Sequence, residues 1–221
     1  MAQYLITAQV GGIYSYTVSD AGTAPVAGAP FVPTPGPDNG EGGVQTEPDL
    51  LALSPNGAYL YALYKQNYTN ATLYSFHMVD GVPEQVSLIG GAGSPAYGEY
   101  GGQGRIVTAS DDYVLMAAAP DENSNGQGRL WVFRSIAGAL SLLDAGQIMP
   151  TVISAWSVQI DDAEHFAYIG YNSTGAAPGA IAPSGLPAVA DSVAIYDISS
   201  VPAVLVNGAQ PQNVALLIGA N

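Results

Sequence analysis

The sequence predicts an all-β protein, a β-propeller, and three observations lead to that class. Glycine and proline are frequent, with 27 and 16 among 221 residues, which favours short strands joined by turns over long helices. Segments rich in tyrosine, phenylalanine, leucine and valine follow the turns, a composition typical of strands. A unit of four such segments also recurs roughly every 50 residues, which is the period of a propeller blade.

The recurring unit is clearest at the turn before its second strand. The turns with their following strands read LSPNGAYLYALY at 53–64, TASDDYVLMAAA at 108–119 and QIDDAEHFAYIGY at 159–171. An apolar segment precedes each turn, and a polar loop after each strand leads to two further apolar segments. The pattern predicts three continuous blades, at about 48–90, 103–147 and 152–208.

A fourth blade is incomplete at the N-terminus. Residues 1–33 supply three strands, with APFVPT as the outer one, but lack a first strand and its turn. The last residues, 212–221, read QNVALLIGAN and resemble that missing strand. Pairing between the two would close a ring and leave no exposed edge. We therefore predict one domain, 1–221, with four blades closed by the C-terminal strand pairing with the N-terminal blade.

Two other architectures remain open. The chain could form an open half-ring whose edge strands pair with a second copy. A sandwich of short strands is the other alternative, although it would not explain the recurring turn.

Charge and composition exclude several functions. Four Lys and Arg against 18 Asp and Glu give a net charge of −14, so the chain lacks the cationic surface that nucleic acids require. The absence of cysteine excludes disulfides and thiolate catalysis. No apolar segment is long enough to span a membrane, so we expect no membrane insertion. The N-terminus MAQYLITAQVGG lacks the features of a signal peptide.

The repeat also resembles a known family. The segments LSPNGAYLYAL and LYSFHMVDG resemble repeats of lactonase-like β-propellers, which include bacterial phosphogluconolactonases, YVTN-repeat surface proteins and fungal muconate cyclases. The resemblance covers about 49–207 and implies a propeller fold. The enzymes of that group generally have seven blades, and this chain is too short for seven, so we transfer no active-site residues.

Few residues suggest catalysis. His77 and His165 are the two histidines, and no GxSxG motif marks a nucleophilic serine. A phosphorylated lactone would need cations, which are scarce. Arg105 opens an inner strand, GRIVTAS, and is the candidate for a ligand in the central channel.

The segment DENSNG, 121–126, resembles the first half of a calcium-binding loop. Asp121, Asn123 and Asn125 would supply side-chain oxygen ligands at alternate positions. Val132 stands where an EF-hand requires glutamate, so any calcium site would be of another kind. A solvated hairpin loop explains the same residues, and we otherwise expect no cofactor.

Tyrosine is abundant, with 14 residues, and three lie in loops rich in glycine or asparagine. Tyr68, Tyr97 and Tyr100 are therefore candidates for contact with a partner, because tyrosine offers contact area at low entropic cost. Packing of these rings on the propeller rim is the alternative.

These observations predict a non-enzymatic structural or recognition propeller. We expect it to act as a subunit of an extracellular or virion assembly, such as a phage capsid or tail, with protein partners and a glycan as a further candidate. The absence of a visible leader suggests a particle protein released by lysis. The alternative is a lactonase-like hydrolase, or a propeller that binds a small ligand or carbohydrate.

Overall fold

The computed structural model describes nine stretches of the chain, and they form strands and turns. The described residues are 3–36, 44–66, 70–90, 104–118, 128–149, 154–172, 192–199, 204–205 and 212–213. Within these stretches, no helix has the length and apolar character needed to cross a membrane.

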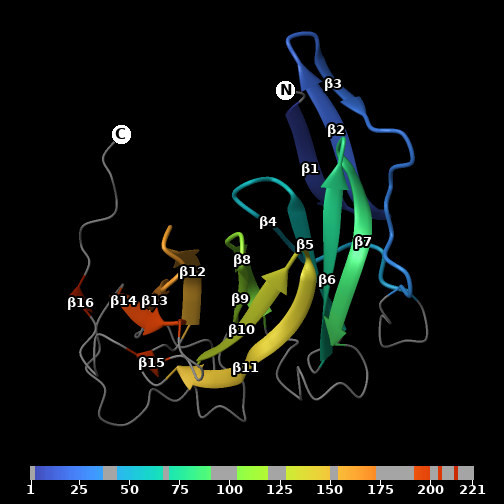
Figure 1. Ribbon diagram of the computed structural model, residues 1–221. Coiled ribbons are helices and arrows are strands. Elements are labelled where there is room, and N and C mark those ends of the chain that lie inside the picture. The colour runs from blue at the N-terminus through green and yellow to red at the C-terminus, as the bar shows by residue number, and fades with distance from the viewer. Residues whose placement is uncertain are drawn as a thin grey trace. The chain divides into compact units, whose positions relative to one another are not determined.

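The strands form four antiparallel sheets, in which neighbouring strands mostly follow one another along the chain (Figure 1). The first sheet contains β1 (Gln3–Gln9), β2 (Gly12–Ser19) and β3 (Gly22–Pro25). The second contains β4 (Leu50–Leu53), β5 (Tyr59–Gln66), β6 (Asn70–Val79) and β7 (Val82–Gly90). The third contains β8 (Gly104–Ala109), β9 (Tyr113–Ala118), β10 (Gly128–Ile136) and β11 (Ala139–Met149).

The fourth sheet contains β12 (Ser154–Ile160), β13 (Phe166–Asn172), β14 (Ser192–Asp197) and β15 (Val204–Leu205). A further short strand, β16 (Gln212–Asn213), pairs with β14. The prediction of an all-β fold is confirmed, and the sheets are antiparallel.

The sheets belong to two compact units. Unit 1 comprises Met1–Gly102 and the hairpin tip Arg134–Ser141, and unit 2 comprises Gln103–Phe133 and Leu142–Asn221. Each unit is described by itself below. The single domain expected over 1–221 stays a prediction.

The middle strands of the sheets are buried on both faces. In β5, the five residues from Leu60 to Tyr64 are at most 2% exposed, and in β9 the four residues from Val114 to Ala117 are fully buried. A strand covered on both sides needs apolar residues at every position, which explains the unbroken apolar runs in the repeat. The residues of the outer strands β3 and β7 are more exposed than those of the middle strands.

Each unit has its own core. In unit 1, Ile13 from the first sheet packs with five residues of β5 and β6, namely Leu60, Ala62, Tyr64, Tyr74 and Phe76. In unit 2, the core joins β9 and β10 to β12, β13 and β14 through residues such as Leu115, Val132 and Ile169. Burial of each large apolar side chain stabilises the fold by about 2 kcal/mol.

The chain after β3 stays close to the first two sheets. Phe31 exchanges two backbone hydrogen bonds with Ile13, at 2.8 and 2.9 Å. Farther along, the Gln85 side chain accepts a bond from Thr34 N at 2.7 Å and donates one to Thr34 O at 2.6 Å. In the first sheet, β3 pairs with β2, and Phe31 adds one bridge at the same strand.

The expected closure of a ring is not seen. Gln212 and Asn213, the first residues of the segment expected to complete the N-terminal blade, pair with Val193 and Ser192 of β14. The remaining residues of that segment, 214–221, lie outside the described residues. Pairing with β14 closes a shorter chain loop than pairing with β1 would, and it therefore costs less conformational entropy. The number of blades is not established by the described sheets.

Two neighbouring tyrosines of unit 1, Tyr64 and Tyr74, should differ in how much their hydroxyls contribute to stability. The Tyr74 hydroxyl donates a hydrogen bond to Pro35 O at 2.7 Å, whereas the buried Tyr64 hydroxyl has no partner among the described residues. We expect Tyr74→Phe to lower the free energy of unfolding by about 1 kcal/mol, and Tyr64→Phe to leave it unchanged or raise it slightly. Urea unfolding of both variants checks this, and a larger loss for Tyr64→Phe would contradict it.

The same pair predicts how stability depends on pH. Burial raises the pKa of Tyr74 to about 12, and burial with the neighbouring Tyr74 raises the pKa of Tyr64 further. Above the ordinary tyrosine pKa of about 10, the unfolded chain loses protons before the folded chain does, so stability falls as pH rises. Because Tyr64→Phe removes one of these groups, the variant's melting temperature should fall less steeply than that of the wild type between pH 10 and 12.

Candidate ligand-binding site

The four-stranded sheets have two unlike ends. At one end, short turns join the first strand to the second, over 54–58, 110–112 and 161–165. At the other end lie the start of each first strand and the end of each second strand, as the pairing of Gly104 with Ala118 shows. The longer connections of the sequence leave and enter the strands at this second end.

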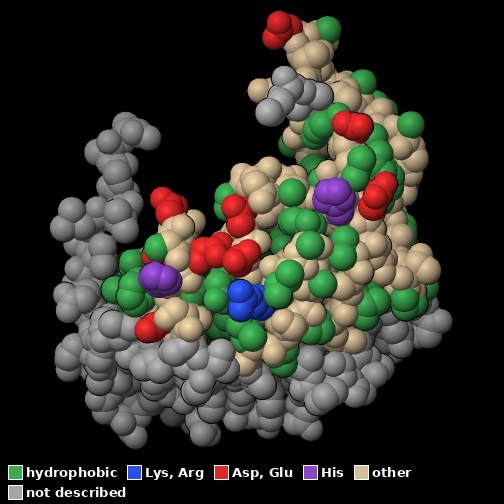
Figure 2. Space-filling view, in the orientation of Figure 1, with side chains coloured by type: hydrophobic (Ala, Val, Ile, Leu, Met, Phe, Trp, Pro, Cys, Tyr) green, Lys and Arg blue, Asp and Glu red, His purple; other side chains and the backbone are tan. Residues whose placement is uncertain are grey.

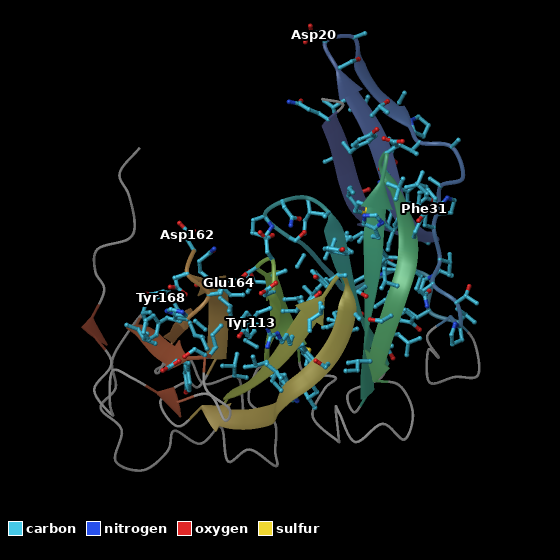
Figure 3. The ribbon with its side chains drawn as sticks, viewed as in Figure 1. Asp20, Phe31, Tyr113, Asp162, Glu164 and Tyr168 are labelled. Carbon is cyan, nitrogen blue, oxygen red and sulfur yellow. The ribbon has the colours of Figure 1, made fainter. Side chains whose placement is uncertain are left out.

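The acidic residues of the short turns are used for structure. Asp161 Oδ1 accepts hydrogen bonds from His165 N at 2.8 Å and Phe166 N at 2.6 Å. Glu164 Oε1 accepts a bond from Asp112 N at 3.0 Å, which joins the two turns of unit 2 near the labelled Glu164 and Tyr113 in Figure 3. Asp161 and Glu164 therefore act as turn residues that satisfy backbone N–H groups. Among the described residues, no group of three His, Asp or Glu could hold a metal ion.

The other end of unit 2 carries two β-bulges, one in each first strand. Between β8 and β9, Gly104 pairs with Ala118 and Ile106 with Ala117, so Arg105 is the extra residue. Between β12 and β13, Ala155 pairs with Tyr171 and Ser157 with Gly170, so Trp156 is the extra residue. Such bulges interrupt the hydrogen-bond ladder and change the direction of a side chain, and they are frequent beside functional sites.

The two bulges occupy the same position in the repeat. Arg105 precedes Ser110 by five residues, and Trp156 precedes Asp161 by five. Ser110 N and Asp161 N make the equivalent bond that ends the first strand, at 2.8 and 3.0 Å. In unit 1 the equivalent position is Asp49, which directly precedes β4, and its N–H donates to Leu63 O at 2.8 Å, so Asp49 and Leu50 both lie opposite Leu63.

Small residues lie on the strands across from both bulges. Ala117 and Ala118 lie across from the bulge at Arg105. Gly170 lies across from Ser157, and a Cβ atom at Gly170 would collide with Ser157 Oγ. The two first strands, β8 and β12, lie next to each other within unit 2. The fold therefore brings two irregular positions together at one end of neighbouring strands.

The residue types at these positions are suited to a small polar ligand. Arginine presents a planar array of donors that matches a carboxylate, a phosphate or a carbonyl oxygen. Tryptophan offers a flat apolar face with one N–H donor. Cations are scarce in this chain, and acidic side chains outnumber basic ones on the face in Figure 2. An arginine at an irregular backbone position therefore stands out.

Of the predicted site residues, one lies within the described residues and the others lie outside them. Arg105 lies in the first strand of its sheet, as the sequence suggested, and it coincides with a bulge. The candidates for partner contact, Tyr68, Tyr97 and Tyr100, lie outside the described residues, as do the calcium candidates Asp121, Asn123 and Asn125. These two assignments stay predictions.

Sequence reasoning did not single out Trp156, the extra residue of the second bulge. A signal was present, because aligning the inner segments GRIVTAS and SAWSVQI on their turns places Arg105 and Trp156 in one column. The bulge itself depends on how two strands pair, so it could not be read from either segment alone. The two histidines do not contribute to this site: His77 is exposed on β6 and lies 5.5 Å from the Tyr59 ring, and His165 is exposed in a turn.

Unit 1 has a hollow of a different character. An open groove of about 530 Å³ is lined mainly by apolar residues, among them Pro30, Phe31, Val32 and Phe76 (Phe31 is labelled in Figure 3). Its amide side chain, Gln85, is already bonded to the Thr34 backbone on both sides. The residues that line the groove include no charged side chain.

Comparison with known proteins gives a fold but no family. No family model and no curated protein matches the chain. Among solved structures, the chain is similar to a candidate 6-phosphogluconolactonase from Bacteroides fragilis, with a TM-score of 0.53, 14% identity and coverage of 88% of this chain and 47% of the other. It is equally similar to a periplasmic gluconolactonase from Pseudomonas aeruginosa, with a TM-score of 0.53, 14% identity and coverage of 89% and 50%.

The chain thus spans about half the length of these two structures. The fold-level resemblance to lactonase-like β-propellers is shown by them. They also contradict the prediction of a non-enzymatic virion subunit and favour the alternative of a lactonase-like protein. That prediction was wrong because it treated the lack of a local catalytic motif as the lack of a site. A propeller can assemble a site from separate strands, each contributing one residue.

Proposed function

We propose that this chain is a lactonase-like hydrolase that acts on a small sugar-acid lactone. The observation that carries the proposal is Arg105 at a bulge in a first strand, in a chain whose fold is similar to that of gluconolactonases. The first strands of a propeller surround its central channel, where a small ligand can be enclosed by several blades.

The reaction would be addition of water to the lactone carbonyl. The ring C–O bond then breaks and its oxygen becomes a hydroxyl, so at neutral pH the products are an open hydroxy carboxylate and a released proton. Negative charge develops on the carbonyl oxygen during this step. A fixed guanidinium near that oxygen would stabilise the charge and accelerate the reaction, as oxyanion-binding groups do in other hydrolases.

Charge favours an uncharged lactone over a phosphorylated one. The net charge of −14 repels dianions over the whole surface, and the chain has four Lys and Arg in total. D-glucono-1,5-lactone is therefore the first substrate to test.

The proposed site needs a ring, and we keep the four-bladed one. β1 pairs with β2 in a regular register and contains no lysine, proline or bulge, which are the usual protections of an exposed edge strand. In the proposed ring, 214–218, which reads VALLI, would pair with that edge. In the alternative, a second copy would cover β1, which would suit a chain half as long as its structural neighbours.

Hydrolysis of D-glucono-1,5-lactone, followed by proton release with a pH indicator, tests the function. We expect a rate above that of spontaneous hydrolysis, and a loss of about 100-fold in kcat/KM for Arg105→Ala. The matched control is Arg134→Ala, which removes the same charge from an exposed position and should retain full activity.

Two outcomes would overturn the proposal. One is a rate no higher than spontaneous hydrolysis across a panel of five- and six-membered sugar lactones, with and without a phosphate group. The other is hydrolysis that Arg105→Ala and Arg134→Ala reduce equally, because that result would show a general charge effect.

A further inference from the structure

We propose that the groove of unit 1 binds a short extended peptide whose apolar centre is flanked by lysine or arginine. The groove has a volume of about 530 Å³, which is within the range typical of ligand clefts. The residues that line it all belong to unit 1, whereas Arg105 belongs to unit 2. Peptide binding and lactone hydrolysis therefore rest on different residues and are tested separately.

Hydrogen bonds within unit 1 hold the walls of this groove in place. One wall is the segment 30–34, and the other is β7. Phe31 exchanges two backbone hydrogen bonds with Ile13, at 2.8 and 2.9 Å. The Gln85 side chain bonds both backbone groups of Thr34, at 2.6 and 2.7 Å, and so ties one wall to the other. Because both walls are already ordered, binding would cost little conformational entropy there.

Apolar side chains line both walls and remain accessible. Val32 on the first wall is 40% exposed, and Val86 on β7 is 41% exposed. The rings of Phe31 and Phe76 also line the groove (Phe31 is labelled in Figure 3). A ligand that covers the two valines would be stabilised by the burial of apolar surface. The ligand therefore needs an apolar centre.

The position of β7 favours a peptide over an apolar small molecule. β7 is the edge strand of its sheet and pairs there with β6, so the backbone groups on its outer side are not used within that sheet. An extended peptide brings donors and acceptors that match such an edge, whereas an apolar small molecule brings none. At about 3.3 Å per residue, the wall from Pro83 to Val86 matches about four residues of an extended peptide.

Charge determines what should flank the apolar centre of the peptide. Glu84 is exposed on β7 between two lining residues, and Asp80 is exposed in the turn that precedes β7. The chain as a whole has a net charge of −14. Lysine or arginine beside the apolar centre complements this surface, and aspartate or glutamate there would be repelled.

A displayed library of random twelve-residue peptides is the probe for this groove. We expect the enriched peptides to share an apolar centre of about four residues with lysine or arginine next to it. Synthetic copies, measured by fluorescence polarisation, should bind with a Kd of about 1–100 μM. Replacement of their lysine and arginine residues with glutamate should weaken binding at least tenfold, to a Kd above about 10 μM.

Valine variants locate the apolar contact. Val86→Asn and Val32→Asn place a polar side chain on opposite walls, and each should weaken peptide binding about tenfold. The matched control is Val10→Asn, because Val10 is 83% exposed in a turn and does not line the groove. It should bind the peptide as the wild type does. Thermal melts by circular dichroism establish that each variant is folded before binding is compared.

Aspartate variants locate the charged contact. Asp80→Asn should weaken binding of the basic peptide about threefold at low salt and have no effect at high salt. The matched control is Asp20→Asn, which removes the same charge from another exposed turn. Figure 3 shows Asp20 at the tip of the β2–β3 hairpin, away from Phe31. Asp20→Asn should leave binding unchanged.

Four outcomes would overturn the peptide site. The first is a library from which no peptide is enriched, including the case in which an apolar dye such as anilinonaphthalene sulfonate binds instead. The second is enrichment of peptides without lysine or arginine. The third is binding that Val86→Asn and Val32→Asn leave unchanged. The fourth is an equal loss for Asp80→Asn and Asp20→Asn, which would show a general charge effect.

Discussion

Replacement of Gly12 with alanine should lower the free energy of unfolding of unit 1 by about 3 kcal/mol. Gly12 has a φ of +142°, which residues with a side chain rarely adopt. A Cβ atom there would stand 2.7 Å from the Phe31 carbonyl oxygen and 3.2 Å from Pro30 Cβ. Because the clash is with backbone, it can be relieved only if the bridge between Ile13 and Phe31 breaks.

Gly22→Ala is the matched control for this substitution. Gly22 also has a positive φ, +114°, but a Cβ atom there would meet nothing within 4 Å. We therefore expect Gly22→Ala to lower the free energy of unfolding by about 1 kcal/mol, which reflects the positive φ alone. Urea unfolding monitored by circular dichroism measures both variants. Equal losses for Gly12→Ala and Gly22→Ala would show that the contact with Phe31 contributes nothing.

The second large effect should come from two serines in unit 1, the buried Ser75 and the half-buried Ser87. Ser75 Oγ and Ser87 Oγ lie 2.9 Å apart, and both donate to the carbonyl of Gly138 in the hairpin tip. Leu140 N in turn donates to Ser87 Oγ at 3.0 Å. The double variant Ser75→Ala/Ser87→Ala leaves these tip groups without side-chain partners, and we expect it to lose about 3 kcal/mol of stability.

A double-mutant cycle makes this prediction specific. Each single variant leaves one hydroxyl to bond Gly138, so each should cost less than half of the double variant. Ser19→Ala is the control, since its hydroxyl donates to Gly22 O at an exposed turn and should contribute little. If the losses of unfolding free energy in the two single variants add up to the loss in the double variant, the idea of a shared network is contradicted.

Local sequence patterns predicted the strands well, for a physical reason. Strands such as β5 and β9 are buried on both faces, so their apolar runs are unbroken and visible in the sequence. The turns were visible as well, because residues such as Asp161 satisfy the nearby backbone N–H groups themselves. The bonds that form such a turn lie within five residues of each other.

Features that depend on distant pairing were not predictable in the same way. The bulge at Trp156 arises from its register with β13, and the pairing of Gln212 with Val193 arises from a choice between competing strands. Arg105 was singled out because cations are rare, whereas Trp156 had no such compositional signal. The prediction of a virion subunit relied on the same local signals, because it was drawn from the lack of a catalytic motif within any one segment.

Hydrolysis of D-glucono-1,5-lactone by the wild-type chain and by its arginine variants tests the central claim most directly. The account predicts a wild-type rate above that of spontaneous hydrolysis, a loss of about 100-fold in kcat/KM for Arg105→Ala and full activity for Arg134→Ala. A wild-type rate no higher than spontaneous hydrolysis, or equal losses of activity for Arg105→Ala and Arg134→Ala, would contradict it.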